Sequence, residues 1–114
     1  SGGVSAAYRR LPLAPGANPA VKCCRNRPSK VGPIDWNITL DFKDRGYANW
    51  PAACEAICEA HPSGRCRYFS HSFRFSNCIL CAACVPEIML GDDTYASFQR
   101  STEDPAVLYS GVLA

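Results

Sequence analysis

Cysteine constrains the fold of this chain more than any other residue type. The 114 residues include eight cysteines, a density typical of small secreted or lumenal domains whose thiols are oxidised to disulfides. An even number allows every cysteine to be paired. Because a chain of this length forms one domain, we expect a single disulfide-stapled unit in an oxidising compartment, either an organelle lumen or the extracellular space.

Charge is distributed unevenly along the chain. The formal net charge is only +2, but the residues before Asp35 are basic without a single acid. The basic residues of this segment are Arg9, Arg10, Lys22, Arg25, Arg27 and Lys30. We therefore expect a cationic segment ahead of a mildly anionic body.

No apolar run is long enough to span a bilayer, so the chain is not expected to cross a membrane. The start lacks a methionine and a leader, which we interpret as a mature, processed product.

Proline and the lack of periodicity set the first part of the chain apart from the rest. Residues 1–33 contain five prolines among glycine, alanine and arginine, with no pattern that would supply a buried face. We interpret them as an extended basic arm held by its cysteines or by a partner surface. Residues 34–100 form the body, and residues 101–114 form a tail without an element of its own.

The body has the pattern of an α+β domain. Apolar and polar residues alternate over 34–42, which predicts a strand with one buried face. A helix follows, with Asn49 as a candidate cap, Pro51 in its first turn and an end near His61. Further strands are predicted at 65–70, 72–75, 78–81 and 94–99. The predicted fold is a small disulfide-stapled antiparallel sheet with one helix packed on it, plus the extended N-terminal arm.

Cysteine spacing within the body resembles that of a known family. Cys54 and Cys58 lie one turn apart on the predicted helix, Cys66-Arg-Tyr-Phe-Ser follows a turn, and Asn77-Cys78-Ile-Leu comes next. In this order the segment resembles the PAN/apple family over about 34–100. The resemblance implies a curved antiparallel sheet with one helix docked across it. It also implies two bonds that pin the helix, Cys54–Cys78 and Cys58–Cys66.

The chain departs from that family in its remaining cysteines. Apple modules often add a bond that joins their two termini, but no cysteine follows Cys84 here. Cys81 and Cys84 then have only Cys23 and Cys24 as partners. We therefore predict two bonds that fasten the arm to the 81–84 segment, and we leave the individual pairing open.

The run from Cys78 to Cys84 also allows metal chemistry. Its Cys-x2-Cys-x2-Cys spacing, followed by Pro-Glu, resembles the cluster loop of bacterial-type ferredoxins, which would make the chain an iron–sulfur redox protein. Ile88 stands where that pattern needs its next cysteine. Zinc could use the same three thiols with His71, but no second matched pair at finger spacing is present. We favour disulfides, and expect neither a metal nor a cofactor.

Catalytic and nucleic-acid patterns are weak. His61 precedes a proline at the predicted helix end, and His71 lies in a serine-rich strand region without a recognisable catalytic partner. The acidic pairs Asp92-Asp93 and Glu103-Asp104 lie in predicted turns. Paired thiols would leave no cysteine nucleophile, so we do not expect an enzyme. The basic arm has too few aromatic residues to form a nucleic-acid groove.

Three functions are compatible with these features. The first is a non-enzymatic accessory subunit whose arm docks on other protein subunits of a larger assembly, for instance on the lumenal side of an algal photosynthetic complex. The second, from the resemblance, is a secreted adhesion or recognition module that binds carbohydrate or protein; the third is the iron–sulfur protein. Candidate partner-binding residues are Arg9, Arg10, Arg25, Arg27, Arg65, Arg67, Phe73, Arg74 and Phe75. Asn37 begins a glycosylation triplet with Thr39, on the polar face of the first predicted strand.

Overall fold

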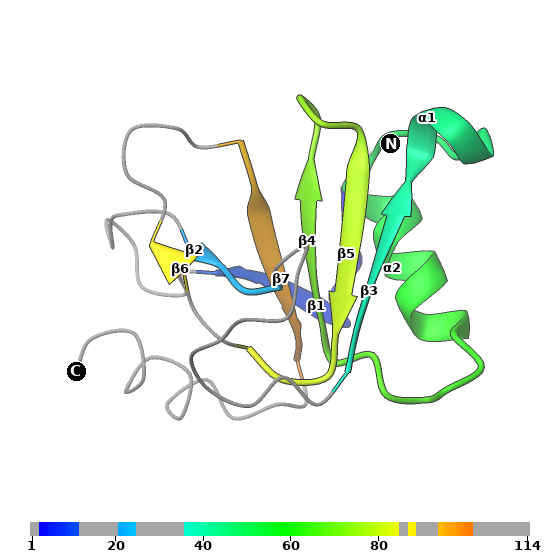
Figure 1. Cartoon of the computed structure of the whole chain (residues 1–114). Helices are drawn as coiled ribbons and strands as arrows, with labels where there is room; N and C mark the ends of the chain where they lie inside the picture. The colour runs from blue at the N-terminus through cyan, green and yellow to red at the C-terminus, as the bar shows by residue number, and fades with distance from the viewer. Residues whose placement is uncertain (1–2, 12–20, 25–35, 85–86, 89–93, 102–114) are drawn as a thin grey trace.

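The computed structural model describes residues 3–11, 21–24, 36–84, 87–88 and 94–101, and it has the α+β fold that the sequence predicts (Figure 1). A five-stranded antiparallel sheet has the order β1-β7-β4-β5-β3, and β2 pairs with β6 in a separate two-stranded sheet. The strands are β1 Tyr8–Leu11, β2 Val21–Lys22, β3 Asn37–Asp41, β4 Tyr68–Ser72, β5 Asn77–Cys81, β6 Glu87–Ile88 and β7 Ala96–Arg100.

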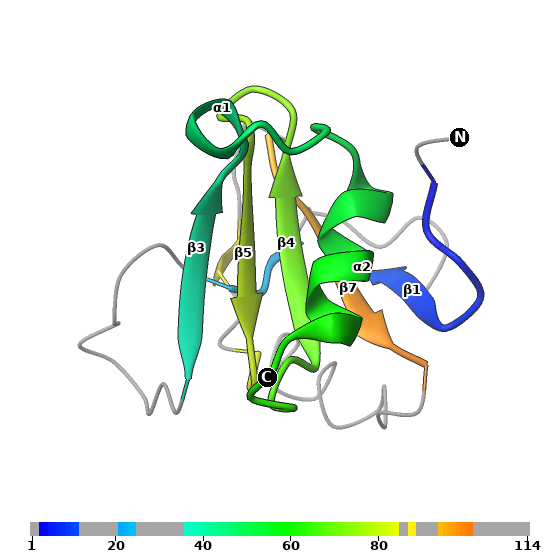
Figure 2. The same ribbon diagram turned by 90° about the vertical axis from the view of Figure 1, so that its right-hand side faces the viewer.

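Helix α2 (Pro51–Ala60) covers one face of the sheet (Figure 2). Pro51 suits the first helical position because its ring fixes φ and its missing N–H would have no partner there, and the alanines that follow favour the helix. Cys54 and Cys58 are both buried against the sheet, as their spacing of four residues predicts. The helix ends at Ala60, one residue before His61 and two before Pro62, close to the predicted end.

A short helix, α1 (Phe42–Arg45), replaces the turn predicted after the first strand. The Asp41 side chain caps it by accepting a hydrogen bond from the Lys43 N–H at 2.9 Å. Gly46 ends it at a φ of 70°, where a side chain would strain the backbone. The first strand consequently ends at Asp41, one residue before the predicted end, because Phe42 turns into the helix.

The hairpin between β4 and β5 also differs from its prediction. The predicted strand over 72–75 is wrong: β4 ends at Ser72, residues 73–76 form the turn, and Asn77 begins β5. Ser76 has a positive φ of 52°, which is uncommon outside glycine and fits a tight turn. The two phenylalanines of the predicted strand therefore lie on an exposed loop instead of alternating into a sheet.

The N-terminal segment contributes to the domain itself. Residues 8–11, which the sequence places in an extended arm, form the edge strand β1 and pair with β7 from Tyr8↔Arg100 to Leu11↔Ser97. Tyr8 and Leu11 are both buried. Two arginines separate these buried residues, so a four-residue strand gives no periodicity that sequence reading could detect. Residues 12–20 and 25–33 of the arm, residues 34–35 at the start of the body, residues 89–93 with the Asp92-Asp93 pair, and the tail beyond Ser101 with Glu103-Asp104 lie outside the described residues.

Two buried clusters lie on opposite sides of the main sheet. On the helix face, Phe69 stacks on Phe98 at 4.8 Å between ring centroids, and both pack with the helical cysteines. The far face carries the second cluster. Its buried members are Leu11, Cys23, Cys24, Ile79, Cys81 and Tyr95. Both faces of the sheet centre are thereby covered.

Candidate functional site

Four disulfides pair all eight cysteines. The bonds are Cys54–Cys78, Cys58–Cys66, Cys23–Cys84 and Cys24–Cys81. The first two agree with the bonds that the PAN/apple resemblance implies. The last two agree with the prediction that the N-terminal cysteines bond to the 81–84 segment, and they resolve the pairing that the sequence left open. The oxidised cysteines indicate an oxidising environment.

Strand geometry argues against a cluster or zinc site in the Cys78–Cys84 run. Residues three apart in a strand point to opposite faces of the sheet. Cys78 accordingly bonds to α2 on the helix face, whereas Cys81 bonds to Cys24 on the far face. Their sulfurs cannot converge on one metal, and Cys84 is bonded to Cys23. Among the described residues, no group of three or more His, Cys, Asp or Glu side chains is arranged to hold a metal ion.

Buried hydroxyl groups hold the N-terminal cysteines on the far face. The N–H of Cys23 donates to Ser97 Oγ at 2.8 Å, and the N–H of Cys24 donates to Ser70 Oγ at 3.0 Å. The two hydroxyls also lie 2.8 Å from each other. Buried backbone donors need such partners, because an unpaired one costs about 1–3 kcal/mol. The segment is thus fastened to the sheet by hydrogen bonds as well as by sulfur.

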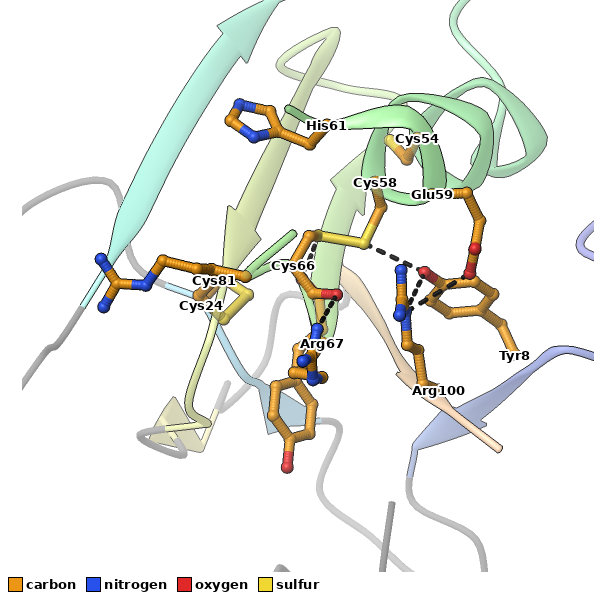
Figure 3. Close-up of a disulfide and its surroundings, with 12 residues drawn as sticks. Tyr8, Cys24, Cys54, Cys58, Glu59, His61, Cys66, Arg67, Cys81 and Arg100 are labelled. Atoms are coloured by element: carbon orange, nitrogen blue, oxygen red, sulfur yellow. Dashed lines mark hydrogen bonds and ion pairs between the residues drawn. A yellow bond between two sulfur atoms is a disulfide. The ribbon is translucent and has the colours of Figure 1, made fainter. Parts of the chain in front are cut away.

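Around Cys58–Cys66, a tyrosine and an ion pair tie three elements together (Figure 3). The Tyr8 hydroxyl of β1 donates to Cys58 Sγ at 3.1 Å and accepts from Arg100 Nε of β7 at 3.0 Å. Arg100 also lies 3.3 Å from Glu59 of α2. Burial is the main cause that raises the pKa of Tyr8 to about 12. The phenol therefore stays protonated and serves as a structural donor.

The predicted contact residues do not form one site. Arg65 and Arg67 precede β4, whereas Phe73, Arg74 and Phe75 follow its end. A five-residue strand separates the two groups by roughly 16 Å. Arg67 also has a local role, since its Nη1 donates to the Gly64 carbonyl at 2.8 Å.

The four arginines of the predicted N-terminal arm are divided as well. Arg9 and Arg10 lie on strand β1, where Arg9 Nε donates to Gln99 Oε1 at 3.4 Å. Arg25 and Arg27 lie outside the described residues. Among the candidate residues that the structure describes, the group at the β4–β5 turn is the one that lies with further exposed aromatic side chains.

Four exposed aromatic side chains gather at one end of the sheet, at the β4–β5 turn and the loop before α2. We call this group the aromatic end; its members, with their exposed fractions, are Tyr47 (43%), Trp50 (52%), Phe73 (57%) and Phe75 (49%). Trp50 and Phe73 contact each other edge to face, with centroids 5.7 Å apart. Single exposed apolar side chains are common on protein surfaces, whereas exposed apolar side chains that gather in one place often mark an interaction site.

Asn49 joins the two loops that carry Trp50 and Phe73. Its Nδ2 donates to the Phe73 carbonyl at 3.1 Å, and its Oδ1 lies 2.8 Å from His71 Nε2. Since the amide oxygen is an acceptor, His71 donates through Nε2–H. Sequence reading assigned Asn49 to the helix cap, but Trp50 occupies that position without a side-chain hydrogen bond.

His71 is buried behind the exposed rings. Its ring lies 4.6 Å from that of Phe73 and 6.2 Å from that of Phe42, which in turn contacts Tyr47 at 5.7 Å. Burial lowers the pKa of His71 to about 4, so the ring is neutral near pH 7. The exposed rings of Tyr47 and Phe73 thus contact a buried pair, Phe42 and His71, and Trp50 is joined to this pair through Phe73.

Phe75 lies on the opposite side of the turn with cationic neighbours. Its ring stacks on Tyr95 at 6.0 Å, and the Arg74 guanidinium lies 5.3 Å from the Phe75 centroid. The Lys22 ammonium lies 4.0 Å above the Tyr95 ring. Cations over aromatic faces are mutually stabilising. Phe73 and Phe75 are not core residues, since about half of each residue's surface meets solvent.

The remaining candidate residues have local structural roles. His61 Nδ1 lies 2.8 Å from Ser63 Oγ, and the His61 ring packs on Trp36 at 4.9 Å. Asn37 begins β3 and is partly buried opposite Cys81. Sequence reading missed Tyr47 and Trp50, because single aromatic residues in a loop and at a helix start carry no signal for exposure.

Comparison with known proteins yields no match: no family description, no curated protein and no solved structure is similar to this chain. No helix within the described ranges has the length and apolar composition that crossing a membrane would require. The aromatic end is therefore the feature of the described residues that bears most directly on function.

Proposed function

We propose that this domain is a non-enzymatic recognition module of an oxidising compartment, similar to PAN/apple domains, and that it binds its partner through the aromatic end. The observation that carries the proposal is the exposure of four large aromatic side chains at one end of a disulfide-stapled frame. Rigid loops with exposed aromatic residues favour binding, because little conformational freedom is lost when the partner docks.

The contacts of the titratable side chains support binding over catalysis. His71 is buried, neutral and engaged with Asn49, and His61 is engaged with Ser63. All eight cysteines are oxidised, so a thiolate nucleophile would first require reduction. A catalytic site would need a nucleophile and a base within hydrogen-bond reach of each other.

The accessory-subunit hypothesis loses its main support. That hypothesis rested on an ordered arm that would need a partner surface to hold it. Tyr8–Leu11 instead pairs with the domain's own β7, and Cys23 and Cys24 bond to its own 81–84 segment. Docking on a larger assembly, such as a lumenal photosynthetic complex, is therefore our second proposal. The recognition module suits an extracellular site or an organelle lumen equally.

Photochemical cross-linking tests the proposed function. The oxidised domain would carry the photoreactive residue benzoylphenylalanine in place of Phe73, and would be irradiated with the extracellular or lumenal proteins and polysaccharides of its source. We expect adducts at position 73 and none at a control position, Arg10, which is exposed on β1. Equal adduct yields at the two positions would count against the aromatic end as a binding surface.

A further inference from the structure

We infer that the partner of the aromatic end is a protein segment that carries an apolar anchor side chain flanked by carboxylates. This inference rests on the proposed function and adds the chemical class of the ligand. Three features of the end support it: the angle between its rings, the use of its polar groups, and its charge.

The ring angle favours a compact apolar side chain over a sugar. The Trp50 and Phe73 rings meet at 79°, which makes a corner bounded by one ring face and one ring edge. A leucine, methionine or phenylalanine side chain can contact both walls of such a corner. A pyranose ring instead stacks on a single flat face.

The side-chain amide beside the corner is already engaged within the domain. Sugar sites need free donors and acceptors next to the aromatic ring to bind hydroxyl groups. Asn49, the residue before Trp50, uses its amide nitrogen for the Phe73 carbonyl and its amide oxygen for His71. The corner therefore suits an apolar ligand better than a polyhydroxylated one.

Charge at this end favours a negative partner. Lys43 and Arg45 are exposed on α1 beside Tyr47, and Arg74 lies on the turn between Phe73 and Phe75.

Helix α2 adds a positive potential at the same end. It begins next to Trp50 with no side-chain cap and no acidic residue in its first turn, so its N-terminus attracts anions. Among the described residues, the acidic groups at this end are Asp44 and Asp41, so the three basic side chains outnumber them by one, and the Asp41 carboxylate already accepts from the Lys43 N–H. Carboxylates beside an apolar anchor would complement this arrangement.

Selection from a random-peptide display library on the immobilised oxidised domain tests the inference. We expect enriched peptides with a negative net charge and at least one large apolar residue. Synthetic copies should bind about tenfold more weakly to the Phe73→Ala and Trp50→Ala variants. Affinity should also fall as salt is raised, and Arg45→Glu should weaken binding more than the charge-matched control Arg10→Glu on β1. Because all four positions are exposed, unchanged thermal unfolding confirms that the variants fold.

The other outcomes are decisive in different ways. Enrichment of neutral or basic peptides, or no enrichment at all, would overturn the inference. If a glycan array instead yields a ligand that Phe73→Ala loses, the inference is wrong and the proposed function stands. If selected ligands bind Phe73→Ala and Trp50→Ala as tightly as the unaltered domain, the proposed function fails together with the inference.

Discussion

Replacing Asn49 by alanine should both loosen the aromatic end and destabilise the fold. The substitution removes two hydrogen bonds, one of 3.1 Å to the Phe73 carbonyl and one of 2.8 Å to His71. Each such bond contributes about 1 kcal/mol, and the N–H of His71, whose side chain is 1% exposed, would lose its acceptor at a further cost of about 1–3 kcal/mol. We therefore expect the free energy of unfolding to fall by about 3–5 kcal/mol, a large share of the stability of a small domain.

Equilibrium unfolding of the oxidised protein in urea measures this loss directly. Ser63→Ala is a matched control, because it also removes two hydrogen bonds, one of 2.8 Å to the other histidine, His61, and one of 3.1 Å from the Arg65 N–H, but at an exposed site. The control should change stability by less than about 0.5 kcal/mol. The chain has two histidines, so NMR of the imidazole protons should report a change at His71 in the Asn49 variant alone. A loss under about 0.5 kcal/mol with an unchanged His71 signal would refute the reasoning that Asn49 holds the two loops together.

Three further predictions concern the frame that carries the aromatic end. The Cys54→Ala/Cys78→Ala pair opens a loop with a sequence separation of 24, so loop entropy predicts a loss of about 3.5 kcal/mol in denaturant unfolding; a loss below about 1 kcal/mol would contradict a staple role. Because the pKa of His71 is lowered to about 4 in the fold and is about 6.5 in the unfolded chain, the unfolded chain binds more protons between these values. The contribution of His71 to stability should therefore be full above pH 6.5, fall by about 3 kcal/mol as the pH drops to 4, and level off below. If the free energy of unfolding of His71→Gln depends on pH as steeply as that of the unaltered domain, this assignment is contradicted. Gly46→Ala should lower the free energy of unfolding in urea by about 1 kcal/mol, since Gly46 has a φ of 70° that strains a residue with a side chain. A gain in stability would argue against that strain.

Local patterns in the sequence were enough to predict the body of the fold. Helix α2 follows from Pro51 and from cysteines one turn apart, and the alternation around Ile38 and Leu40 predicts β3. The hairpin was misread because the Ser72-to-Phe75 run alternates like a strand while the chain needs its turn there. Periodicity reports which residues could share a face, but only the pairing of β4 with β5 determines where the reversal falls.

The candidate site could be predicted only in part, since its residues come together through tertiary contacts. Phe73 and Phe75 were singled out from the sequence, whereas Trp50 joins Phe73 only through the docking of α2 on the sheet. The ferredoxin-like spacing illustrates the opposite case. Three thiols at that spacing converge in a loop, but a strand directs Cys78 and Cys81 to opposite faces. The same residues therefore support different chemistry according to the backbone beneath them.

The Cys23–Cys84 bond gives the domain a particular response to mechanical tension. It closes a covalent loop with a sequence separation of 61, so a pull on the two ends of the chain would pass through the sulfur bridge and bypass α2, β3, β4 and β5. Outside this loop lie β1, β2, β6 and β7; backbone hydrogen bonds hold β1 to β7 and β2 to β6. Under load, these strands should separate first, while Trp50, Phe73 and the loops that carry them lie within the covalent loop and keep their arrangement.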